Sequence, residues 1–358
     1  ATLIEITGVA KNKSNTLGRQ QEKRSVAQKI KIFLGPLIMF FFAFSSGGGI
    51  FYKKREFKEK LHKIISENQD KKINILTSYN PWFIIKLGYL FKSKYDINWI
   101  IDYRDLPFQN IVEPITFLPI FKRYVKKITK ISDKTICVTN EIKNKINKFD
   151  PGKAIFYPTG YDEDDFKEIN VLKAQESNNE YVSVRYAGRF YPDAYRSLEP
   201  FVRMLKNLEA QQIEVLFEYA GPQESYVVEL FKKYKIEEKL ICHGLLSRSE
   251  SLKFQASSDI LLSISYTGKD QNKGDGIITG KIFEYIKSNK PIINICTPNW
   301  ELSSLIKSSL SNLCITIDEE DKFNEFIINR KYLMPVEYNR ELLNKFDHCY
   351  LVDKIREI

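Results

Sequence analysis

Histidine and cysteine are scarce in this sequence of 358 residues, and their positions do not predict a metal site. None of the three histidines (His62, His243 and His348) has a second candidate ligand at a spacing typical of zinc sites. The five cysteines form no Cys-x-x-Cys pair and are odd in number. Scattered cysteines of this kind are typical of a reducing compartment. We therefore expect a cytoplasmic protein without a bound metal.

The sequence also lacks an apolar run long enough to span a membrane. Its most apolar stretch, residues 32–44, contains Gly35 and Pro36 and is shorter than the roughly 20 residues that a spanning helix needs. We expect this stretch to be buried core or an interfacial segment. The residues before it are polar and basic, so we expect neither a signal peptide nor export.

Positive charge is in excess, with a formal net charge of +10. This balance favours an anionic partner, which could be nucleic acid, a phospholipid surface or a phosphorylated small molecule. No RNP, zinc-finger or helix-turn-helix signature is present, so we expect no nucleic acid partner. A content of 43% hydrophobic residues excludes a disordered chain and is typical of a globular protein.

Strand-like and helix-like patterns alternate along the chain, whose length favours two domains. Alternation at this spacing predicts parallel, doubly wound sheets. The expected strands cover residues 73–77, 99–103, 135–138, 154–157, 182–187, 215–220, 240–243, 260–263, 291–295 and 313–317. A polar segment, 167–180, predicts the boundary between the two domains. We therefore expect an N-terminal domain at 1–170, a C-terminal domain at 171–335, and a helical segment at 336–358 that packs back towards the N-terminal domain.

The most informative segment is the loop 274–281, which opens a predicted helix. Its glycines let backbone N–H groups approach an anion, the helix start adds partial positive charge, and Lys281 supplies a full one. Glu284, one helical turn later, could accept hydrogen bonds from ribose hydroxyls, so the segment suits a nucleoside diphosphate. The alternative is a simple turn and helix cap at Thr279 and Gly280, with Lys281 and Glu284 as a surface pair.

Together with other segments, this loop resembles the family-4-like glycosyltransferases of the two-Rossmann-domain, or GT-B, type. The sequence GKIFEYI at 280–286, followed by KPII at 290–293, is similar to that family's GKxxEYxxxxKPII signature. In the first half, residues 157–166 resemble the family's interdomain loop. Residues 78–81 and 102–105 resemble its acceptor-side SxPP and DxRD segments. Further similarities lie at 188–196, 220–222, 243–247 and 258–262.

The resemblance implies two Rossmann-like domains that face a central cleft. It also implies a retaining, hexosyltransferase-type transfer from a nucleotide sugar to a glycan or lipid-linked acceptor in the synthesis of cell-surface polysaccharide or glycoconjugate, without metal or other cofactor. The catalytic residues expected on this basis are Arg189, Lys281 and Asp105. Those expected to bind the donor are Gly188, Arg196, Gly221, Ser247, Thr279, Gly280 and Glu284. Those on the acceptor side are Asp102, Arg104 and Asn80.

Three departures from the family pattern affect these expectations. Gly276 stands where the family commonly has a glutamate that contacts the sugar. A lysine common after the phosphate-binding arginine is missing, which leaves Arg196 as the nearest replacement. No N-terminal strand with a glycine-rich acceptor loop is recognisable before Ile30, and we interpret residues 47–49 as a turn.

Several interpretations stay open at the level of sequence. The acidic run 162–165 favours a solvated hinge over a metal site, while Asp102 and Asp105 suit a salt bridge with Arg104 as well as acceptor contact or base catalysis. Residues 117–134 form a basic amphipathic pattern that suits either an ordinary core-facing helix or docking on an anionic membrane at the inner face of the cell. A nucleotide-sugar epimerase and a catalytically silent sugar-nucleotide-binding protein are the rival functions.

Overall fold

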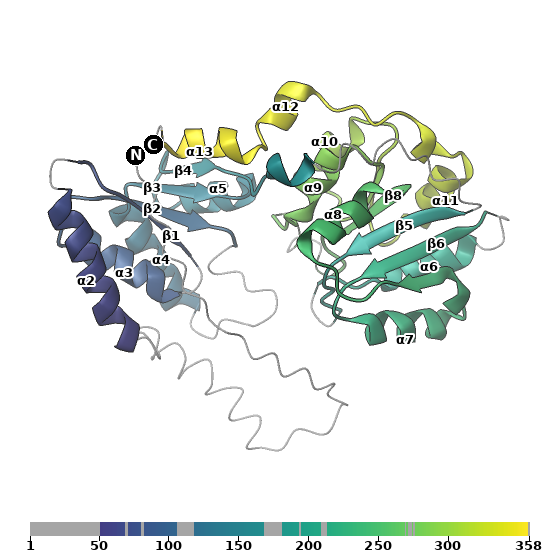
Figure 1. The fold of residues 1–358 in the computed structure, drawn as a ribbon, viewed down its shortest axis with the longest axis horizontal. Coiled ribbons are helices and arrows are strands. Elements are labelled where there is room, and N and C mark those ends of the chain that lie inside the picture. Colours follow the sequence, from purple (N-terminus) through teal and green to yellow (C-terminus); the bar gives the residue numbers. More distant parts are fainter. Residues whose placement is uncertain are drawn as a thin grey trace, which may run out of the picture.

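The computed structural model describes residues 51–356, except 69–70, 80–81, 106–117, 168–180, 193–194, 209–212, 269, 271–273 and 275. Two α/β domains lie next to each other along the long axis of the molecule (Figure 1). Each is built on a sheet in which every strand pair is parallel. The expected fold class, two Rossmann-like α/β domains, is confirmed.

The N-terminal sheet has the strand order β1-β2-β3-β4. In chain order its elements are α2 (Phe51–Glu67), β1 (Asn74–Ser78), α3 (Trp82–Lys92), β2 (Asn98–Tyr103), α4 (Leu118–Ile131), β3 (Lys134–Cys137), α5 (Asn140–Asn147) and β4 (Ala154–Phe156). All six residues of β2 are buried, which is typical of a central strand of a parallel sheet covered on both faces. The core that covers one face includes Ile85 of α3, Val125 of α4 and Ile142 of α5.

The C-terminal sheet has the order β10-β9-β8-β5-β6-β7. Its strands are β5 (Val182–Ala187), β6 (Val215–Ala220), β7 (Leu240–Cys242), β8 (Ile260–Ile264), β9 (Ile292–Ile295) and β10 (Leu313–Ile315). The first strand, β5, therefore lies in the middle of the sheet, between β6 and β8. The strand order reverses at this point, where open α/β sheets bind their ligands beyond the carboxyl ends of the strands.

Helices cover both faces of this sheet, as expected for a doubly wound domain. On one face α6 (Glu199–Leu208), α7 (Glu224–Tyr234) and α11 (Glu320–Ile328) bury their apolar sides against alternate strand residues. On the other face lie α8 (Arg248–Ala256), α9 (Lys281–Ser288) and α10 (Ser303–Lys307). The second face holds the predicted ligand-binding helix α9, which packs under the interdomain loop through Ile282 and Phe283.

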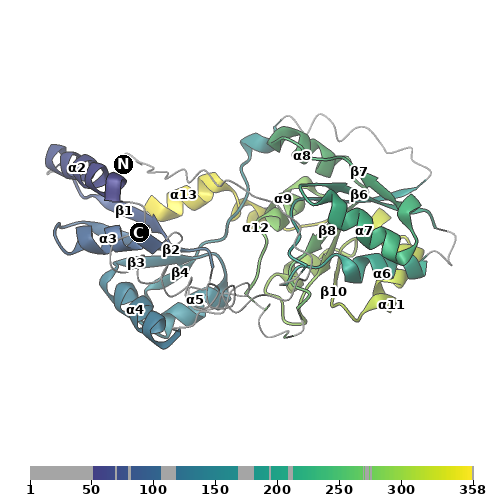
Figure 2. The same ribbon diagram turned by 90° about the horizontal axis from the view of Figure 1, so that it is seen from below.

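The chain passes between the domains twice. After β4, Tyr161 donates its backbone N–H to the carbonyl of Phe346, and the N–H of His348 returns a bond to the Tyr161 carbonyl, each at 2.9 Å. These bonds join the first crossing to the segment that carries α12 (Arg340–Asn344) and α13 (His348–Arg356). In Figures 1 and 2, α13 lies beside the N-terminal sheet. The exact domain boundaries remain a prediction.

The basic helix was predicted to extend too far. The helix α4 ends at Ile131, whereas Lys134 is already the first residue of β3, so the expected span 117–134 is wrong at its C-terminal end. Asp133 explains the stop, because its N–H donates to the Trp99 carbonyl at 2.8 Å and its carboxylate accepts from the Trp99 N–H at 2.7 Å. These bonds tie the chain to β2 before a further helical turn can form.

Other predicted features lie outside the described residues, among them Phe117, the apolar stretch 32–44 and the glycines at 47–49. Among the residues that are described, none of the helices combines the length and the apolar character needed to cross a lipid bilayer.

Candidate functional site

Lys281, the first residue of α9, lies directly against Gly188 at the end of β5. A Cβ atom placed on Gly188 would lie 1.8 Å from Lys281 Nζ, and Gly188 has a φ of +143°. The backbone conformation therefore favours glycine, and a methyl group at this position would displace the end of the Lys281 side chain. The ammonium group also lies 4.6 Å from the centroid of the Tyr186 ring. The predicted partners Gly188 and Lys281 thus meet at the point where the strand order reverses.

The carboxyl ends of three neighbouring strands are tied together beside this lysine. The N–H of Gly188 donates to the Ala220 carbonyl, and the N–H of Gly221 donates to the Gly244 carbonyl, both at 2.8 Å. A Cβ on Gly221 would lie 2.3 Å from the Gly188 carbonyl oxygen, so this position also requires a close backbone approach. The backbone segments that follow β5, β6 and β7 are thus packed closely together beside Lys281.

Two further cations stand near Lys281. The Arg196 guanidinium lies over the rings of Tyr191 and Tyr195, with centroid distances of 5.6 and 5.4 Å. Its Nε is buried and, within the described part of the chain, has no hydrogen-bond partner. Arg189 follows Gly188 directly and is exposed. Positive charge gathered at one edge of the sheet favours an anionic ligand.

These surroundings shift the pKa of Lys281. Burial and, to a smaller extent, the nearby charge of Arg196 lower the pKa of its ammonium group to about 8, while Glu284 acts in the opposite direction. A desolvated cation next to a second cation is unfavourable, and an anion bound between them would relieve both costs. The charges of this site therefore favour the binding of an anion.

The start of α9 adds backbone donors to the same place. The N-cap Gly280 has helical dihedral angles and provides no side chain to cap the first turn. A small hollow lies next to it, lined by Tyr186, Ser263, Ile264, Thr279, Lys281 and Tyr285. Ser263 Oγ in this hollow is buried and, among the described residues, lacks a hydrogen-bond partner. The N–H groups of Ile282 and Phe283 donate to the carbonyls of Thr279 and Gly280, so the contribution of the helix start is mainly its partial positive charge, which suits the oxygen atoms of a diphosphate.

Glu284 has a partner that the sequence analysis missed. Arg248 donates from Nη1 to Glu284 Oε1 and from Nη2 to Asp165 Oδ2, each at 2.7 Å. Arg248 therefore links the helix α9 to the interdomain loop. The only signal for this contact in the sequence is that Arg248 directly follows Ser247, the last residue of a segment that resembles the family. One oxygen of Glu284 is thus held by Arg248, which orients the carboxylate.

Ser247 has a structural task in addition to any contact with a ligand. Its side chain caps α8 by accepting from the N–H of Glu250, while Glu250 bonds back to the N–H of Ser247, which together form a capping box. The capped helix presents Arg248 in its first turn. Donor contact by Ser247 stays a prediction.

On the facing domain, Asp102 and Arg104 form an ion pair at the end of β2, with Arg104 Nε 2.8 Å from Asp102 Oδ2. Burial raises the pKa of the Asp102 carboxyl, and Arg104 opposes this shift. Asp105 is exposed, and its charge contributes to the raised pKa of Tyr195, for which burial is the larger cause. Asp105 thus lies near the C-terminal domain. Asn80 lies outside the described residues.

In the described part of the chain, no group of three or more His, Cys, Asp or Glu side chains is arranged to hold a metal ion. The acidic run at 162–165 is instead engaged in ion pairs. Asp165 pairs with Arg248, and Glu163 pairs with Lys287 of α9. A reaction without metal stays a prediction.

No family model matches the sequence, and a search of curated proteins found no similar sequence. Solved structures do match, at low sequence identity. Sucrose-phosphate synthase from Thermosynechococcus elongatus is 13% identical over 86% of this chain and 78% of its own, with a TM-score of 0.57. The pneumococcal O-GlcNAc transferase GtfA, solved with UDP and GlcNAc, is 10% identical over 84% of this chain, with a TM-score of 0.54. This chain spans only 59% of the length of GtfA.

A structure described as a putative UDP-N-acetylglucosamine 2-epimerase from Listeria monocytogenes matches as well. It is 10% identical over 83% of this chain and 76% of its own, with a TM-score of 0.50. Transferases and an epimerase therefore share this architecture, and fold alone does not separate the two reactions. What the comparisons and the two parallel sheets establish together is that this chain has the two-Rossmann-domain, GT-B fold.

Proposed function

We propose that this protein is a retaining glycosyltransferase that transfers a sugar from a nucleotide sugar to a glycan or lipid-linked acceptor in the synthesis of cell-surface polysaccharide or glycoconjugate. The observation that carries the proposal is the contact of Lys281 with Gly188 beside Arg196, at the reversal of strand order. The presence of UDP in the GtfA structure supports a nucleoside diphosphate as the ligand of such a site.

In this proposal Lys281, Arg189 and Arg196 neutralise the diphosphate. When the bond between the sugar and the diphosphate breaks, negative charge grows on the leaving oxygen, and fixed cations near that oxygen lower the barrier. The partial positive charge at the start of α9 acts in the same sense. The protein's own cations would then replace the metal ion that other phosphate sites require.

The acceptor side belongs to the N-terminal domain. Asp105 lies near the C-terminal domain and is the candidate to contact the attacking hydroxyl, while the ion pair with Arg104 holds Asp102 in place. We further propose that the protein docks on an anionic membrane at its cytoplasmic face through α4. Four exposed cations on this helix support the second proposal: Lys122, Arg123, Lys126 and Lys127.

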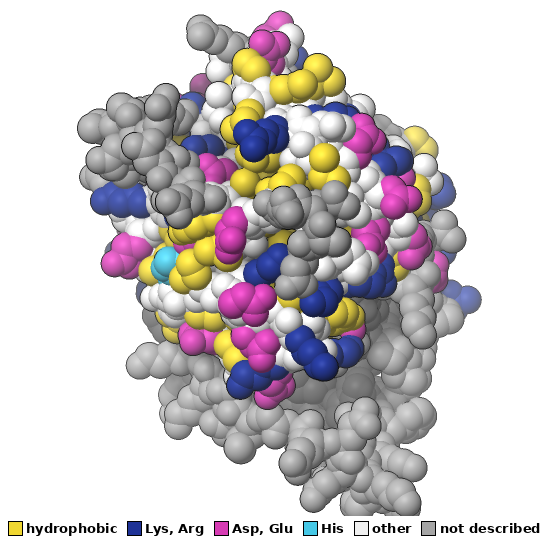
Figure 3. All heavy atoms as spheres, turned by 90° about the vertical axis from the view of Figure 1, so that its right-hand side faces the viewer, with side chains coloured by type: hydrophobic (Ala, Val, Ile, Leu, Met, Phe, Trp, Pro, Cys, Tyr) yellow, Lys and Arg dark blue, Asp and Glu magenta, His cyan; other side chains and the backbone are white. Residues whose placement is uncertain are grey.

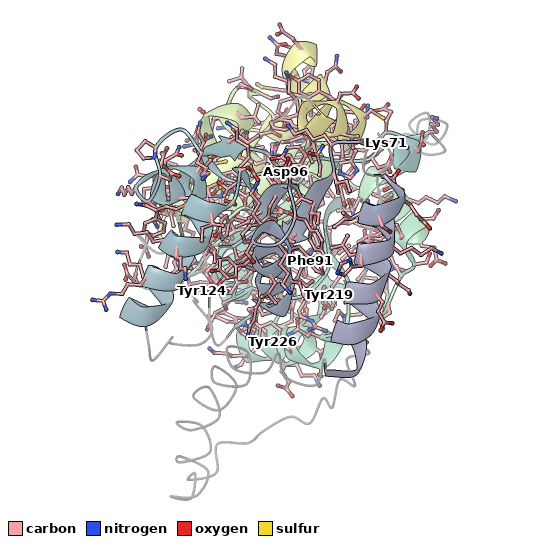
Figure 4. All side chains as sticks on the ribbon, turned by 90° about the vertical axis from the view of Figure 1, so that its left-hand side faces the viewer. Lys71, Phe91, Asp96, Tyr124, Tyr219 and Tyr226 are labelled. Carbon is pink, nitrogen blue, oxygen red and sulfur yellow. The ribbon has the colours of Figure 1, made fainter. Side chains whose placement is uncertain are left out.

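The distribution of charge favours α4 as the docking surface. Figure 4 views the molecule from the N-terminal domain, where Tyr124 marks α4. The opposite end of the molecule, seen in Figure 3, shows cationic and anionic side chains interspersed over its visible part. A stripe of one sign attracts anionic lipid headgroups, whereas an interspersed surface does not.

Product analysis after incubation with candidate donors tests the function directly. The protein is incubated with UDP-, GDP-, ADP- and dTDP-sugars and a membrane extract as the source of acceptor. Transfer of sugar with release of the nucleoside diphosphate supports the proposal. An isomerised donor would identify an epimerase, and binding without turnover would identify a silent sugar-nucleotide-binding protein.

A further inference from the structure

The helix α5 of the N-terminal domain meets the loop before α9 at Gly276. A Cβ atom on Gly276 would lie 2.9 Å from Cγ and 3.0 Å from Cβ of Glu141, and 3.6 Å from Thr139 Oγ1. The backbone at Gly276 is outside the left-handed region, so the Glu141 side chain is what excludes a side chain there. Glycine at this position therefore admits a glutamate from the facing domain.

A second set of bonds fixes α5 against the C-terminal domain. Glu301 Oε1 accepts from the backbone N–H and the side-chain Nδ2 of Asn140, at 2.7 and 2.8 Å, and Oε2 accepts from the N–H of Glu141 at 3.2 Å. A carboxylate at a helix N-terminus is favourable because the orphan N–H groups point towards it. Next to Glu301, Trp300 donates from Nε1 to the Ile277 carbonyl at 2.8 Å, which fixes the loop. The bonds of Glu301 thus fix α5, and the bond of Trp300 fixes the loop, at the place where Glu141 meets Gly276.

The loop has few polar side chains of its own. Residues 276–280 read Gly-Ile-Ile-Thr-Gly, so Thr279 alone among them can form a side-chain hydrogen bond. The loop also faces the N-terminal domain at its other end, where a Cβ on Gly280 would lie 3.4 Å from Thr159 Cγ2. A sugar attached to a diphosphate at Lys281 must therefore find most of its partners on the facing domain.

Glu141 has the chemistry that such a sugar needs. Its Oε1 atom lies 2.9 Å from Lys145 Nζ, one turn along the helix, so the two side chains form an ion pair. An ionised carboxylate only accepts hydrogen bonds and can take two from neighbouring hydroxyls. Sugars present such pairs of hydroxyls, whereas the diphosphate offers none and would be repelled.

We propose that Glu141 is a specificity-determining residue that accepts hydrogen bonds from hydroxyls of the transferred sugar, from the domain that packs against the donor loop. The inference rests on the proposed function, since it assigns the sugar end of the same donor site. In this arrangement Glu141 of the acceptor-side domain contacts the sugar at the place where the donor loop has Gly276.

The test compares the dissociation constants of sugar nucleotides with those of the matching nucleoside diphosphates. Parent protein and Glu141→Gln are titrated with UDP-, GDP-, ADP- and dTDP-sugars, each beside its free diphosphate. The loss of a charge-assisted hydrogen bond should weaken sugar-nucleotide binding by roughly 10-fold to 100-fold, with the diphosphate unchanged. Gly276→Ala should act in the same direction, because the new methyl group displaces Glu141 without removing its charge.

A rescue and a control separate this role from a structural one. Glu141→Ala combined with Gly276→Glu returns a carboxylate from the loop of the C-terminal domain and should restore the preference for the sugar nucleotide. Glu67→Gln on α2 is the matched control, because Glu67 also pairs with a lysine four residues away, at 3.7 Å, on a helix remote from the C-terminal domain in Figure 1. It should leave both constants unchanged.

Two results would overturn the inference while the proposed function stands. One is an unchanged preference in Glu141→Gln, and the other is an equal loss of both ligands, which would mean that Glu141 only holds the domains together. If the parent protein binds no member of the panel, the proposed function and this inference fail together.

Discussion

The contact between Lys281 and Gly188 is the residue-scale feature on which the proposed function depends. Sequence spacing alone placed both residues at strand or helix ends, but it did not show that they touch. The structure adds that Lys281 is desolvated, which lowers its pKa to about 8. A lysine in water has a pKa near 10.4, so this side chain titrates much closer to neutral pH.

Donor affinity should therefore depend on pH. Below about pH 8 the free protein already carries the ammonium charge, so affinity should be flat; above it a proton must be taken up on binding, and the dissociation constant should rise by nearly 10-fold per pH unit. Calorimetric titration of a nucleotide sugar between pH 7 and pH 9 measures this slope. In Lys281→Ala the slope should vanish. A constant affinity in the parent protein would show that Lys281 does not meet the diphosphate.

Gly188→Ala should abolish donor binding, because the methyl group would occupy the position of Lys281 Nζ. The positive φ also costs roughly 1–3 kcal/mol of stability for a residue with a side chain. Gly152→Ala is the matched control, since Gly152 has a φ of +77° but nothing within 4 Å of the added atom. Both variants should lose stability in thermal unfolding, Gly188→Ala the more because its methyl group also displaces Lys281, and only the first should lose affinity. Equal affinity in the two variants would contradict the assigned packing.

At the scale of elements, the sequence predicted strands better than contacts between them. The strands 182–187 and 215–220 have the predicted bounds, because alternating β-branched and aromatic residues end sharply at glycine. The end of α4 was missed because the bonds of Asp133 to Trp99 come from a strand distant in sequence. The link from Arg248 to Glu284 and the approach of Glu141 to Gly276 are of the same kind. Such contacts depend on tertiary packing, which spacing does not encode.

Glu284 on α9 is predicted to recognise the ribose of the donor. Glu284→Gln should weaken ribonucleotide binding by roughly 10-fold, since a charge-assisted hydrogen bond is lost, and should have little effect on a deoxyribose donor. Arg248→Ala should cause a smaller loss with the same dependence on ribose, because it orients the carboxylate. Titration of both donors into each variant measures these differences. Equal losses for both donors would make Glu284 a purely structural residue.

The helix α4 is predicted to bind anionic membranes. Replacing Lys122, Arg123, Lys126 and Lys127, four of its five exposed cations, by glutamine should release the protein from vesicles that contain phosphatidylserine, at about 1 kcal/mol per cation. Binding of the parent protein should weaken with salt, since the Debye length falls from about 10 Å at 0.1 M to about 3 Å at 1 M. Co-sedimentation with vesicles measures both effects.

An equal loss of charge elsewhere serves as the control. Four exposed lysines of the C-terminal domain are suitable: Lys232, Lys235, Lys253 and Lys307. Their replacement by glutamine should reduce vesicle binding much less than the α4 variant, and donor affinity should be intact in the α4 variant. A parent protein that ignores anionic vesicles at low salt would show that α4 is an ordinary solvated face.

At the scale of the whole molecule, charged side chains join the two domains at two places. Near the interdomain loop, Arg248 and Lys287 of the C-terminal domain bind Asp165 and Glu163. At the other, Glu301 caps the N-terminus of α5. Because both places adjoin α9 or the loop before it, the arrangement of the domains and the shape of the donor site are coupled. The GT-B fold could be predicted from sequence motifs, but this coupling could not.

The most direct test of the account is calorimetric titration of the donor selected by the panel, and of its nucleoside diphosphate, into the parent protein and Lys281→Ala. The variant removes the cation that lies against Gly188 and leaves the fold of α9 intact, because alanine is a good helix former. We predict that both ligands lose at least roughly 10-fold in affinity, as expected when a charge-assisted contact is removed. Equal affinity of the two proteins for the nucleoside diphosphate would contradict the placement of the diphosphate at the start of α9.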